Sequence, residues 1–229
     1  MFIRKAEILS IPAMPVVTMI RNYYNKDWFY DSLFDIYGIS MPVRIKQAVA
    51  KRKSEYLAAR IASRDLMRLF GIDDAQITLK ENRAPLWPSG IVGSITHTDN
   101  VTVIAAGRER DINGVGIDCE KIVEHEIVDK LSEHVLTENE IVLMRRMGIC
   151  PRDFFTLAFS AKESLYKAVN GYYGISPEFK DAQLERLDIA SGQFVVKLEV
   201  ARHNGRGIYK QFNGQALFFD KYVMTLICH

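Results

Sequence analysis

One long segment of helical periodicity, residues 42–70, restricts the fold of this chain more than any other feature of its sequence. Its apolar residues recur at roughly helical intervals, Pro42 suits a first helical turn, and Gly71 suits a C-terminal cap. The segment therefore predicts one helix, and the first forty residues read as a strand-like start followed by aromatic-rich loops and turns. The basic residues that form a stripe on this helix, at intervals of four, are Arg60, Arg64 and Arg68.

The rest of the chain supplies strand-like and helical segments without a glycine-rich linker between them. An alternating run at 101–107, the turn pair Asn113-Gly114 and a second run at 115–120 predict a hairpin over 101–120. The segment 153–170 is predicted to be a helix that ends at Gly171. The other segments predicted by pattern are a helix over 126–147 and strands near 194–200, 215–219 and 223–227. This order predicts an α+β fold with mainly antiparallel sheets.

Composition and cysteine usage indicate a soluble globular protein. The chain has 229 residues, of which 48% are hydrophobic and 25% charged, which excludes a disordered chain, a collagen-like repeat and a disulfide-stapled miniprotein. Three cysteines without C-x-x-C spacing disfavour a disulfide framework or a structural zinc site. The N-terminus lacks the apolar stretch of a signal peptide, and no apolar run reaches about 18 residues. We expect a cytoplasmic monomer with no membrane span.

The formal net charge of +2 conceals two segments of opposite sign. Residues 41–70 carry eight Lys/Arg against two acidic residues, whereas residues 118–140 carry eight Asp/Glu against two lysines. The chain could therefore place a polyanion beside a cation site, and the simpler explanation is two solvated helix faces. A nucleotide-binding or RNA-binding module on the basic helix is disfavoured, because such a protein would be more basic and would interleave stacking aromatics with its cations.

Two carboxylates occupy a strand where apolar residues are expected. In the run Gly-Ile-Asp-Cys-Glu at 116–120, strand alternation puts Asp118 and Glu120 on the same face. Adjacent carboxylates repel each other and are costly to bury, and a hard divalent cation such as Mg²⁺ removes both problems. An exposed strand end with two solvated acids explains the pair as well. No Walker-type phosphate loop, dinucleotide-binding glycine motif or H-E-x-x-H helix competes with this interpretation.

A second set of polar residues lies in the run Phe-Ser-Ala-Lys-Glu-Ser-Leu-Tyr-Lys-Ala at 159–168. Glu163 and Lys167 share a helix face, so they would form either a surface ion pair or, together, a metal ligand and a phosphate contact. A capping box from Ser160 to Glu163 is disfavoured, because the helical pattern already begins upstream. A third piece is His97, in a polar turn before a strand, which by itself is most simply a surface or satisfied core histidine.

Together these pieces resemble one family. The patterns S-x-[ST]-H at 94–97, G-[IV]-D-x-E at 116–120 and K-E-[SA]-x-x-K-A at 162–168 occur in the order and spacing that are the signature of the 4′-phosphopantetheinyl transferases. The segment 51–60 resembles the family's K-R-x-x-E-[FY]-x-x-x-R helix. The segment 83–94 resembles the R-x-P-x-W-P-x-G-x-x-G-S stretch of its enterobactin synthase component D branch. This resemblance covers about residues 43–200.

The resemblance implies one compact chain of two similar α+β halves, residues 1–114 and 115–229, related by a pseudo-twofold axis, with coenzyme A and Mg²⁺ in the cleft between them. The metal ligands that it implies are Asp118, Glu120 and Glu163. Catalysis would fall to Glu163 and Lys167, and Lys167 would contact the pyrophosphate. Arg52 and Arg60 would meet the 3′-phosphate end. The other coenzyme A contacts that it implies are Asn82, Arg83, Pro85, Thr96, His97, Asp118 and Lys162.

Two positions depart from the family pattern. Phe159 stands where the family often has Trp, which changes packing rather than chemistry. Asn82 stands where a basic residue is frequent, and the neighbouring Arg83 would compensate.

The activity that the resemblance implies is transfer of 4′-phosphopantetheine from coenzyme A to a serine of an apo carrier protein, with release of 3′,5′-ADP. Phosphoryl transfer depends mostly on positioning and charge neutralisation, which suits Mg²⁺ held by carboxylates with a lysine alongside. The acceptor would be an acidic carrier domain of siderophore or other nonribosomal peptide synthesis. The alternative acceptor is a fatty-acid or polyketide acyl carrier protein, and the identity of the general base stays open between Glu163 and a water.

Overall fold

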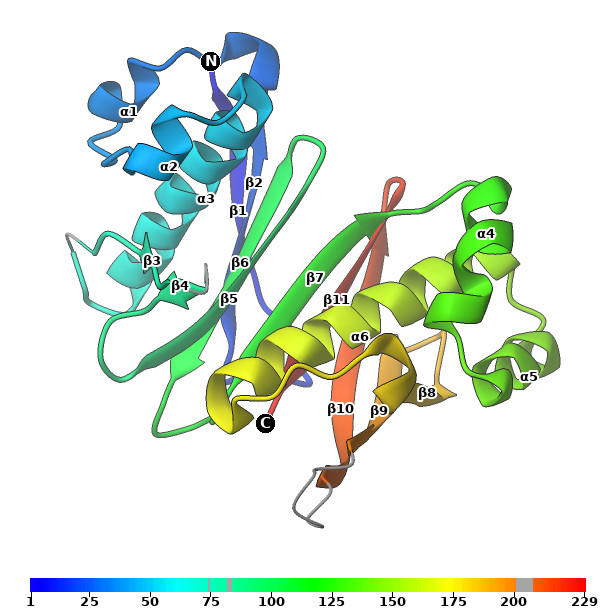
Figure 1. Cartoon of the computed structure of the whole chain (residues 1–229). Helices are drawn as coiled ribbons and strands as arrows, with labels where there is room; N and C mark the ends of the chain where they lie inside the picture. Colours follow the sequence, from blue (N-terminus) through cyan, green and yellow to red (C-terminus); the bar gives the residue numbers. More distant parts are fainter. Residues whose placement is uncertain (74, 82–83, 201–207) are drawn as a thin grey trace. The chain divides into compact units, whose positions relative to one another are not determined.

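Two units, Met1–Ile112 and Asn113–His229, make up the chain in the computed structural model, which describes residues 1–73, 75–81, 84–200 and 208–229. Each unit contains its own antiparallel sheet and its own long helix (Figure 1). The mixed α+β architecture predicted from the sequence is confirmed. No helix within the described residues is long and apolar enough to cross a membrane.

The first unit is a four-stranded antiparallel sheet in the order β1-β2-β6-β5. Its strands are β1 (Ile3–Leu9), β2 (Thr18–Tyr24), β5 (Ile91–Thr98) and β6 (Val101–Arg108). Helix α3 (Ala50–Leu69) covers one face, because its small and apolar side chains such as Ala62 and Leu66 pack against Ile20 of β2 and Ile104 of β6. The short elements are the 3-10 helix η1 (Lys26–Trp28), α1 (Leu33–Ile36), α2 (Val43–Lys46), β3 (Thr78–Leu79) and β4 (Pro85–Leu86).

The second unit is a five-stranded antiparallel sheet in the order β7-β11-β10-β9-β8. Its strands are β7 (Val115–Lys121), β8 (Ala182–Leu187), β9 (Gln193–Val200), β10 (Ile208–Phe219) and β11 (Tyr222–Cys228). The long helix α6 (Pro151–Tyr173) lies across one face of this sheet (Figure 1). The remaining elements are α4 (His125–Val135), α5 (Glu138–Met147) and the 3-10 helix η2 (Phe179–Asp181).

The predicted hairpin over 101–120 is wrong. Strand β6 pairs with β5 and β2, whereas β7 pairs with β11, so the two strands belong to different sheets. The tight turn that the sequence placed at Asn113-Gly114 lies instead between β5 and β6, where Asp99 has a φ of 43°. Asn113 has another use, since its backbone N–H donates to the carbonyl oxygen of His229 at 2.6 Å beside the β7–β11 ladder.

Two predicted helices are interrupted. The segment 42–70 divides into α2 and α3, because Val49 is extended, with ψ near 155°, and serves as the N-cap of α3. The segment 126–147 divides into α4 and α5 at Thr137, whose side chain and Glu140 form a capping box. Helix α6 continues through Gly171 and ends at Gly174, which has a φ of 62°. Pattern reasoning also missed β2 and β8 and placed His97 in a turn, whereas it lies within β5.

Candidate active site

Strand β7 carries two carboxylates of the candidate site. It pairs with β11 so that Asp118 lies opposite Thr225 and Glu120 lies opposite Val223. The two acids are on the same face of the strand, as the alternation of the sequence predicts. Asp118 is buried and Glu120 is half-buried, so the alternative explanation, an exposed strand end with two solvated acids, does not hold for this pair.

Helix α6 lies directly on the face of β7 that carries these acids. Gly116 shares that face with Asp118, and a Cβ on Gly116 would fall on the carbonyl oxygen of Ser164. The glycine of the 116–120 motif therefore has a packing role, because a side chain there would push the helix away from the strand. This close approach brings the side chains of the 159–168 segment over the two carboxylates.

Three hydroxyl groups fix the register of α6 on the sheet. The Ser160 hydroxyl lies 2.9 Å from Thr225 Oγ1, and the Ser164 hydroxyl donates to the Thr225 carbonyl oxygen at 2.9 Å. All three side chains are buried, so each hydrogen bond is made where an unmade one would be costly. The contact also excludes Ser160 as a helix cap, since α6 begins nine residues earlier at Pro151.

Lys167 forms its ion pair with Asp118. Its ammonium nitrogen lies 2.7 Å from Asp118 Oδ1 and also donates to the Ile117 carbonyl oxygen at 3.1 Å. The Asp118 side chain is 4% exposed, so this is a largely desolvated pair rather than a surface one. The surface pair between Glu163 and Lys167 does not form in the described structure, and Lys167 instead connects α6 to β7.

The three carboxylates of β7 and α6 interact electrostatically. Burial raises the pKa of Glu120 to about 7, the charge on Asp118 raises it as well, and Lys167 partly opposes both effects. Burial also raises the pKa of Glu163; Lys167 lowers that pKa and Asp118 raises it. Because Glu120 and Glu163 both respond to the charges on Asp118 and Lys167, these four side chains form one electrostatic cluster.

This donor set has the chemistry of a Mg²⁺ site. Several carboxylate oxygens that repel one another in a half-buried position are what a hard divalent cation binds. Within the described residues, no group of three or more His, Cys, Asp or Glu side chains forms a ready-made metal site. The type of donor therefore fits Mg²⁺, while in this structure Lys167 forms an ion pair with one of the three acids, Asp118.

Lys162, next to Glu163 in the chain, has a different environment. Its ammonium donates to Glu140 Oε2 and to the Val135 carbonyl oxygen, both at 2.7 Å, and its side chain is 2% exposed. Burial lowers its pKa, and the charge on Glu140 opposes that effect. A contact between Lys162 and coenzyme A would require the ammonium to leave this buried pair, so the structure does not place Lys162 with the acid cluster.

A groove of about 540 Å³ opens beside Glu163. One wall is α6, which contributes Glu163 and Tyr166, and η2 contributes Phe179 to another. The Phe179 ring stacks on Phe159 at 5.1 Å between centroids, so Phe159 packs against a residue that lines the groove. The other lining residues are His134, Lys162, Pro177, Glu178, Lys180 and Ala182.

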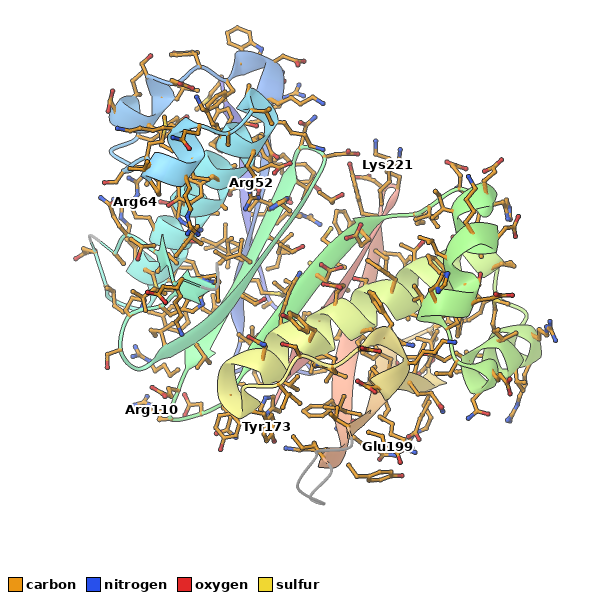
Figure 2. All side chains as sticks on the ribbon, viewed as in Figure 1. Arg52, Arg64, Arg110, Tyr173, Glu199 and Lys221 are labelled. Carbon is orange, nitrogen blue, oxygen red and sulfur yellow. The ribbon has the colours of Figure 1, made fainter. Side chains whose placement is uncertain are left out.

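The first unit brings Arg52 and His97 together. Arg52 projects from α3 (Figure 2), and its guanidinium lies 2.9 Å from His97 Nε2 on β5. An arginine only donates, so Nε2 accepts and the imidazole carries its proton on Nδ1, which lies 3.8 Å from the Glu55 carboxylate. The resemblance implied both residues as coenzyme A contacts, and these two are adjacent in space although 45 positions apart.

Arg60 is buried on the same helix. Its guanidinium carbon lies 4.4 Å above the Tyr56 ring, and burial lowers its pKa, which the Tyr56 side chain opposes and the charge on Arg52 reinforces. It lines a cavity of about 100 Å³ together with Tyr56, Gln76 and Thr78. A buried cation without a carboxylate partner among the described residues provides a charge that an anion would compensate.

Models of one family match most of the chain. The 4′-phosphopantetheinyl transferase N-terminal domain matches residues 42–107, and the 4′-phosphopantetheinyl transferase superfamily matches residues 114–227. This chain belongs to the 4′-phosphopantetheinyl transferase superfamily. The two matched segments hold the basic helix and the acid cluster, respectively.

Named members of the superfamily are similar to part of this chain. Enterobactin synthase component D of Salmonella typhi is 34% identical over 145 residues, 63% of this chain and 59% of that protein. The same component from Escherichia coli K12 is 32% identical over 134 residues, 58% of this chain and 63% of that protein. The 4′-phosphopantetheinyl transferase Npt of Nocardia iowensis is 26% identical over 200 residues, 81% of this chain and 86% of that protein. The chain thus spans about six tenths of the length of these enterobactin synthase components.

The superfamily's upstream motif is only partly described. Pro85 lies in β4 and pairs with Leu79 of β3. A Cβ on Gly93 would overlap the Trp87 ring, which explains the spacing of the tryptophan and glycine in this motif. Asn82 and Arg83, expected among the coenzyme A contacts, lie outside the described residues.

One expected pair is separated by the sheet. Thr96 and His97 are neighbours in β5, and strand alternation points them to opposite faces, with His97 on the side of Arg52. Thr96 is buried, whereas the His97 side chain is 34% exposed. His97, and not Thr96, therefore lies on the face of the sheet from which Arg52 approaches.

Sequence reasoning missed residues that contribute to the site through the fold. Glu140 is fully buried and pairs with Lys162, and Tyr166, Phe179 and Lys180 line the groove. The one available signal was the Thr-x-x-Glu spacing of the capping box at Thr137, which identifies a helix start inside a segment of continuous helical periodicity.

Proposed function

We propose that this member of the superfamily transfers the 4′-phosphopantetheine group of coenzyme A to a serine of an apo carrier protein, with Mg²⁺ as cofactor and 3′,5′-ADP as the second product. The serine oxygen forms a bond to the β-phosphorus of coenzyme A, the bond from that phosphorus to the bridging oxygen breaks, and 3′,5′-ADP leaves with the electron pair. Support comes from the family match of both units and from the names of the relatives that extend over them.

The observation that carries the proposal is the cluster formed by Asp118, Glu120, Glu163 and Lys167. It combines three half-buried or buried carboxylates on β7 and α6 with an ammonium 2.7 Å from Asp118. Mg²⁺, when bound, would supply charge neutralisation at the pyrophosphate oxygens. Asp118, Glu120 and Glu163 are the residues that would hold it.

The chain's own residues have distinct parts in this proposal. Lys167 provides a fixed positive charge toward which the pyrophosphate is drawn. Glu163 belongs to the acid cluster and also lines the groove, so it is the carboxylate best placed to accept the serine proton. Arg52, Arg60 and His97 provide the cationic and hydrogen-bonding groups for the 3′-phosphate end.

The groove beside Glu163 suits the phosphopantetheine arm. The arm is a flexible chain of methylene and amide groups, and the groove combines apolar Phe179 and Tyr166 with polar Lys180 and His134. Because Glu163 lies at its edge, an arm in the groove would keep its phosphate end near the acid cluster.

The carrier protein is proposed to dock on the basic surface of residues 43–51. Arg44, Lys46 and Lys51 are exposed there and make no ion pair with another described residue, and Val43 and Val49 beside them are 71% and 73% exposed. Exposed cations around apolar side chains complement an acidic amphipathic helix. The relatives' names favour carriers of enterobactin-type assembly, and a fatty-acid or polyketide acyl carrier protein is the alternative.

The test is a transfer assay on a panel of apo carriers. Each carrier is incubated with the chain, coenzyme A and Mg²⁺, and its intact mass is measured for the gain of one phosphopantetheinyl group. We expect transfer to aryl or peptidyl carriers, none with EDTA, and recovery when Mg²⁺ is restored. Absence of transfer to every carrier would contradict the activity, and transfer undiminished by EDTA would contradict the metal.

The setting of the reaction is also proposed. We expect the chain to act as a monomer in a reducing cytoplasm, which agrees with three free cysteines, Cys119, Cys150 and Cys228. A single light-scattering mass equal to one chain in the active fraction is the expected result. The pseudo-twofold relation of the two halves and the cleft between them stay predictions of the resemblance.

A further inference from the structure

The buried carboxylate of Glu140 joins elements that surround the groove. Its Oε2 atom accepts from Lys162 Nζ and from the Thr137 backbone N–H, both at 2.7 Å. Its Oε1 atom accepts from the Leu184 backbone N–H, also at 2.7 Å. The residue is 0% exposed, so one carboxylate without contact to solvent connects the start of α5 to α6 and to β8.

Lys162 extends the connection to α4. Its ammonium donates to the carbonyl oxygen of Val135, the last residue of that helix, at 2.7 Å. The residues on either side of these contacts line the groove: His134 precedes Val135, Glu163 follows Lys162, and Ala182 lies two positions before Leu184. The parts of α4, α6 and β8 that line the groove are therefore all held by the ion pair between Glu140 and Lys162.

An ion pair this buried adds little to the free energy of unfolding, but it fixes the positions of the groups that it contacts. Desolvation of the two charges offsets much of their attraction, so an apolar pair of similar volume would stabilise the unit about as well. An apolar pair, however, would not specify the positions of the Thr137, Leu184 and Val135 backbones, because only the charged groups accept and donate these hydrogen bonds. The pair is thus better explained by the geometry it imposes than by the free energy it adds.

We propose that Glu140 is a positioning residue that sets the shape of the groove and thereby its affinity for the phosphopantetheine arm of coenzyme A. The inference rests on the proposed function, because it takes the arm as the occupant of the groove. Glu140 does not touch the substrate in this view. It acts through Lys162 and the walls on which His134, Glu163 and Ala182 lie.

The test compares two ligands that differ by the arm. Coenzyme A has it and 3′,5′-ADP lacks it, and the dissociation constants of both are measured by calorimetry on the full chain. For Glu140→Gln, which keeps the shape and removes the charge, we expect the dissociation constant of coenzyme A to rise at least about tenfold. That of 3′,5′-ADP should change by less than about twofold. Glu140→Asp keeps the charge and should recover part of the coenzyme A affinity.

Matched controls separate positioning from general damage. Glu7→Gln removes a carboxylate from an ion pair with Arg21 in the first unit and should leave both dissociation constants unchanged. If Glu140→Gln fails to fold, the double variant Glu140→Gln with Lys162→Met removes both buried charges and takes its place, with the same expected ligand difference. Thermal melts identify the folded variants.

The outcomes are distinct for the two proposals. Equal loss of affinity for both ligands, or no loss for either, would overturn the positioning role of Glu140. A selective loss of coenzyme A affinity would support it, even if the wild-type chain transferred nothing to any carrier. In that case the proposed transferase activity would be refuted, whereas the positioning role of Glu140 would be supported.

Discussion

Lys167 and Glu163 show how one turn of a helix separates two electrostatic environments. Lys167 reaches back to β7 and holds Asp118 at 2.7 Å, whereas Glu163 borders the groove, where burial raises its pKa. The two side chains are four positions apart, a spacing that by itself is compatible with a surface ion pair or with a metal ligand beside a phosphate contact. Their functional consequences should therefore differ, and they can be measured separately.

Glu163→Gln preserves the shape of the side chain and removes its charge. We expect the transfer rate to fall at least about a hundredfold, because Mg²⁺ would lose one of the carboxylates proposed to hold it and the serine proton would lose its acceptor. The fold should persist, since removal of this charge relieves repulsion with Asp118. Initial rates against Mg²⁺ concentration, with thermal melts as control, check this. A variant with a near-normal rate would remove Glu163 from the site.

Lys167→Met keeps most of the stem and removes the ammonium. We expect the coenzyme A concentration for half-saturation to rise at least about tenfold, because the pyrophosphate loses a cation. The pKa of Glu120 and of Glu163 should rise further, since Lys167 lowers both. The measurement is initial rate against coenzyme A. The matched control is Lys221→Met, in the turn before β11 (Figure 2), which should leave the coenzyme A concentration for half-saturation unchanged. Equal effects of the two substitutions would refute the specific role.

Much of the residue-level site follows from local pattern alone. Strand alternation is enough to put Asp118 and Glu120 on one face, and helical spacing is enough to align Glu163 with Lys167. The contacts that complete the cluster in each unit are not local. Lys167 meets Asp118 across 49 positions and Arg52 meets His97 across 45, and such contacts depend on how a helix packs on a sheet. No periodicity within either segment carries that information.

At the scale of elements, the central contact is the packing of α6 on β7. Gly116 permits it, because any Cβ there would overlap the Ser164 carbonyl oxygen. The sequence predicted both elements, although it placed β7 in a hairpin with β6. That error has a physical cause: an Asn-Gly pair favours a tight turn, but here the pair lies beside the β7–β11 ladder, where Asn113 donates to the C-terminal strand's end.

Gly116→Ala should therefore destabilise the chain by roughly 1–3 kcal/mol, because the helix must shift to admit a methyl group into a packed contact. The displaced α6 should also reduce transfer, since Lys167 would be drawn from Asp118. The control is Gly171→Ala on the same helix, where nothing lies within 4 Å of the added carbon. That substitution should stabilise by about 0.4–1 kcal/mol. Urea unfolding measures both, and equal stability of the two variants would contradict the packing role of Gly116.

At the scale of the whole molecule, charge is divided between the units. The basic helix segment lies in the first unit and the acidic segment around α4 in the second, so the near-zero net charge results from compensation rather than uniform mixing. The sequence alone showed the two segments of opposite charge. It did not show which cations are compensated: Lys53 pairs with Asp31 at 2.7 Å, whereas Lys46 makes no ion pair with another described residue.

Lys46→Glu reverses one of these uncompensated charges. We expect the KM for an acidic carrier to rise about tenfold at low ionic strength and less at high salt, with the KM for coenzyme A unchanged. The control is Arg110→Glu (Figure 2), a reversal at a residue whose side chain is 78% exposed, outside the basic surface. Steady-state kinetics at two salt concentrations make the comparison. Equal changes for both variants would indicate only net charge, not a docking surface.

Among the described strands, β7 pairs with β11 alone, and β11 is the last of these strands in the sequence. During synthesis the acids of β7 emerge roughly a hundred residues before the strand that holds them in place. The candidate acid cluster can therefore form only after β11 has been made. A chain truncated before β11 would carry all the acidic residues of the candidate site and lack the strand that pairs with β7, so the proposed activity is expected to depend on that strand.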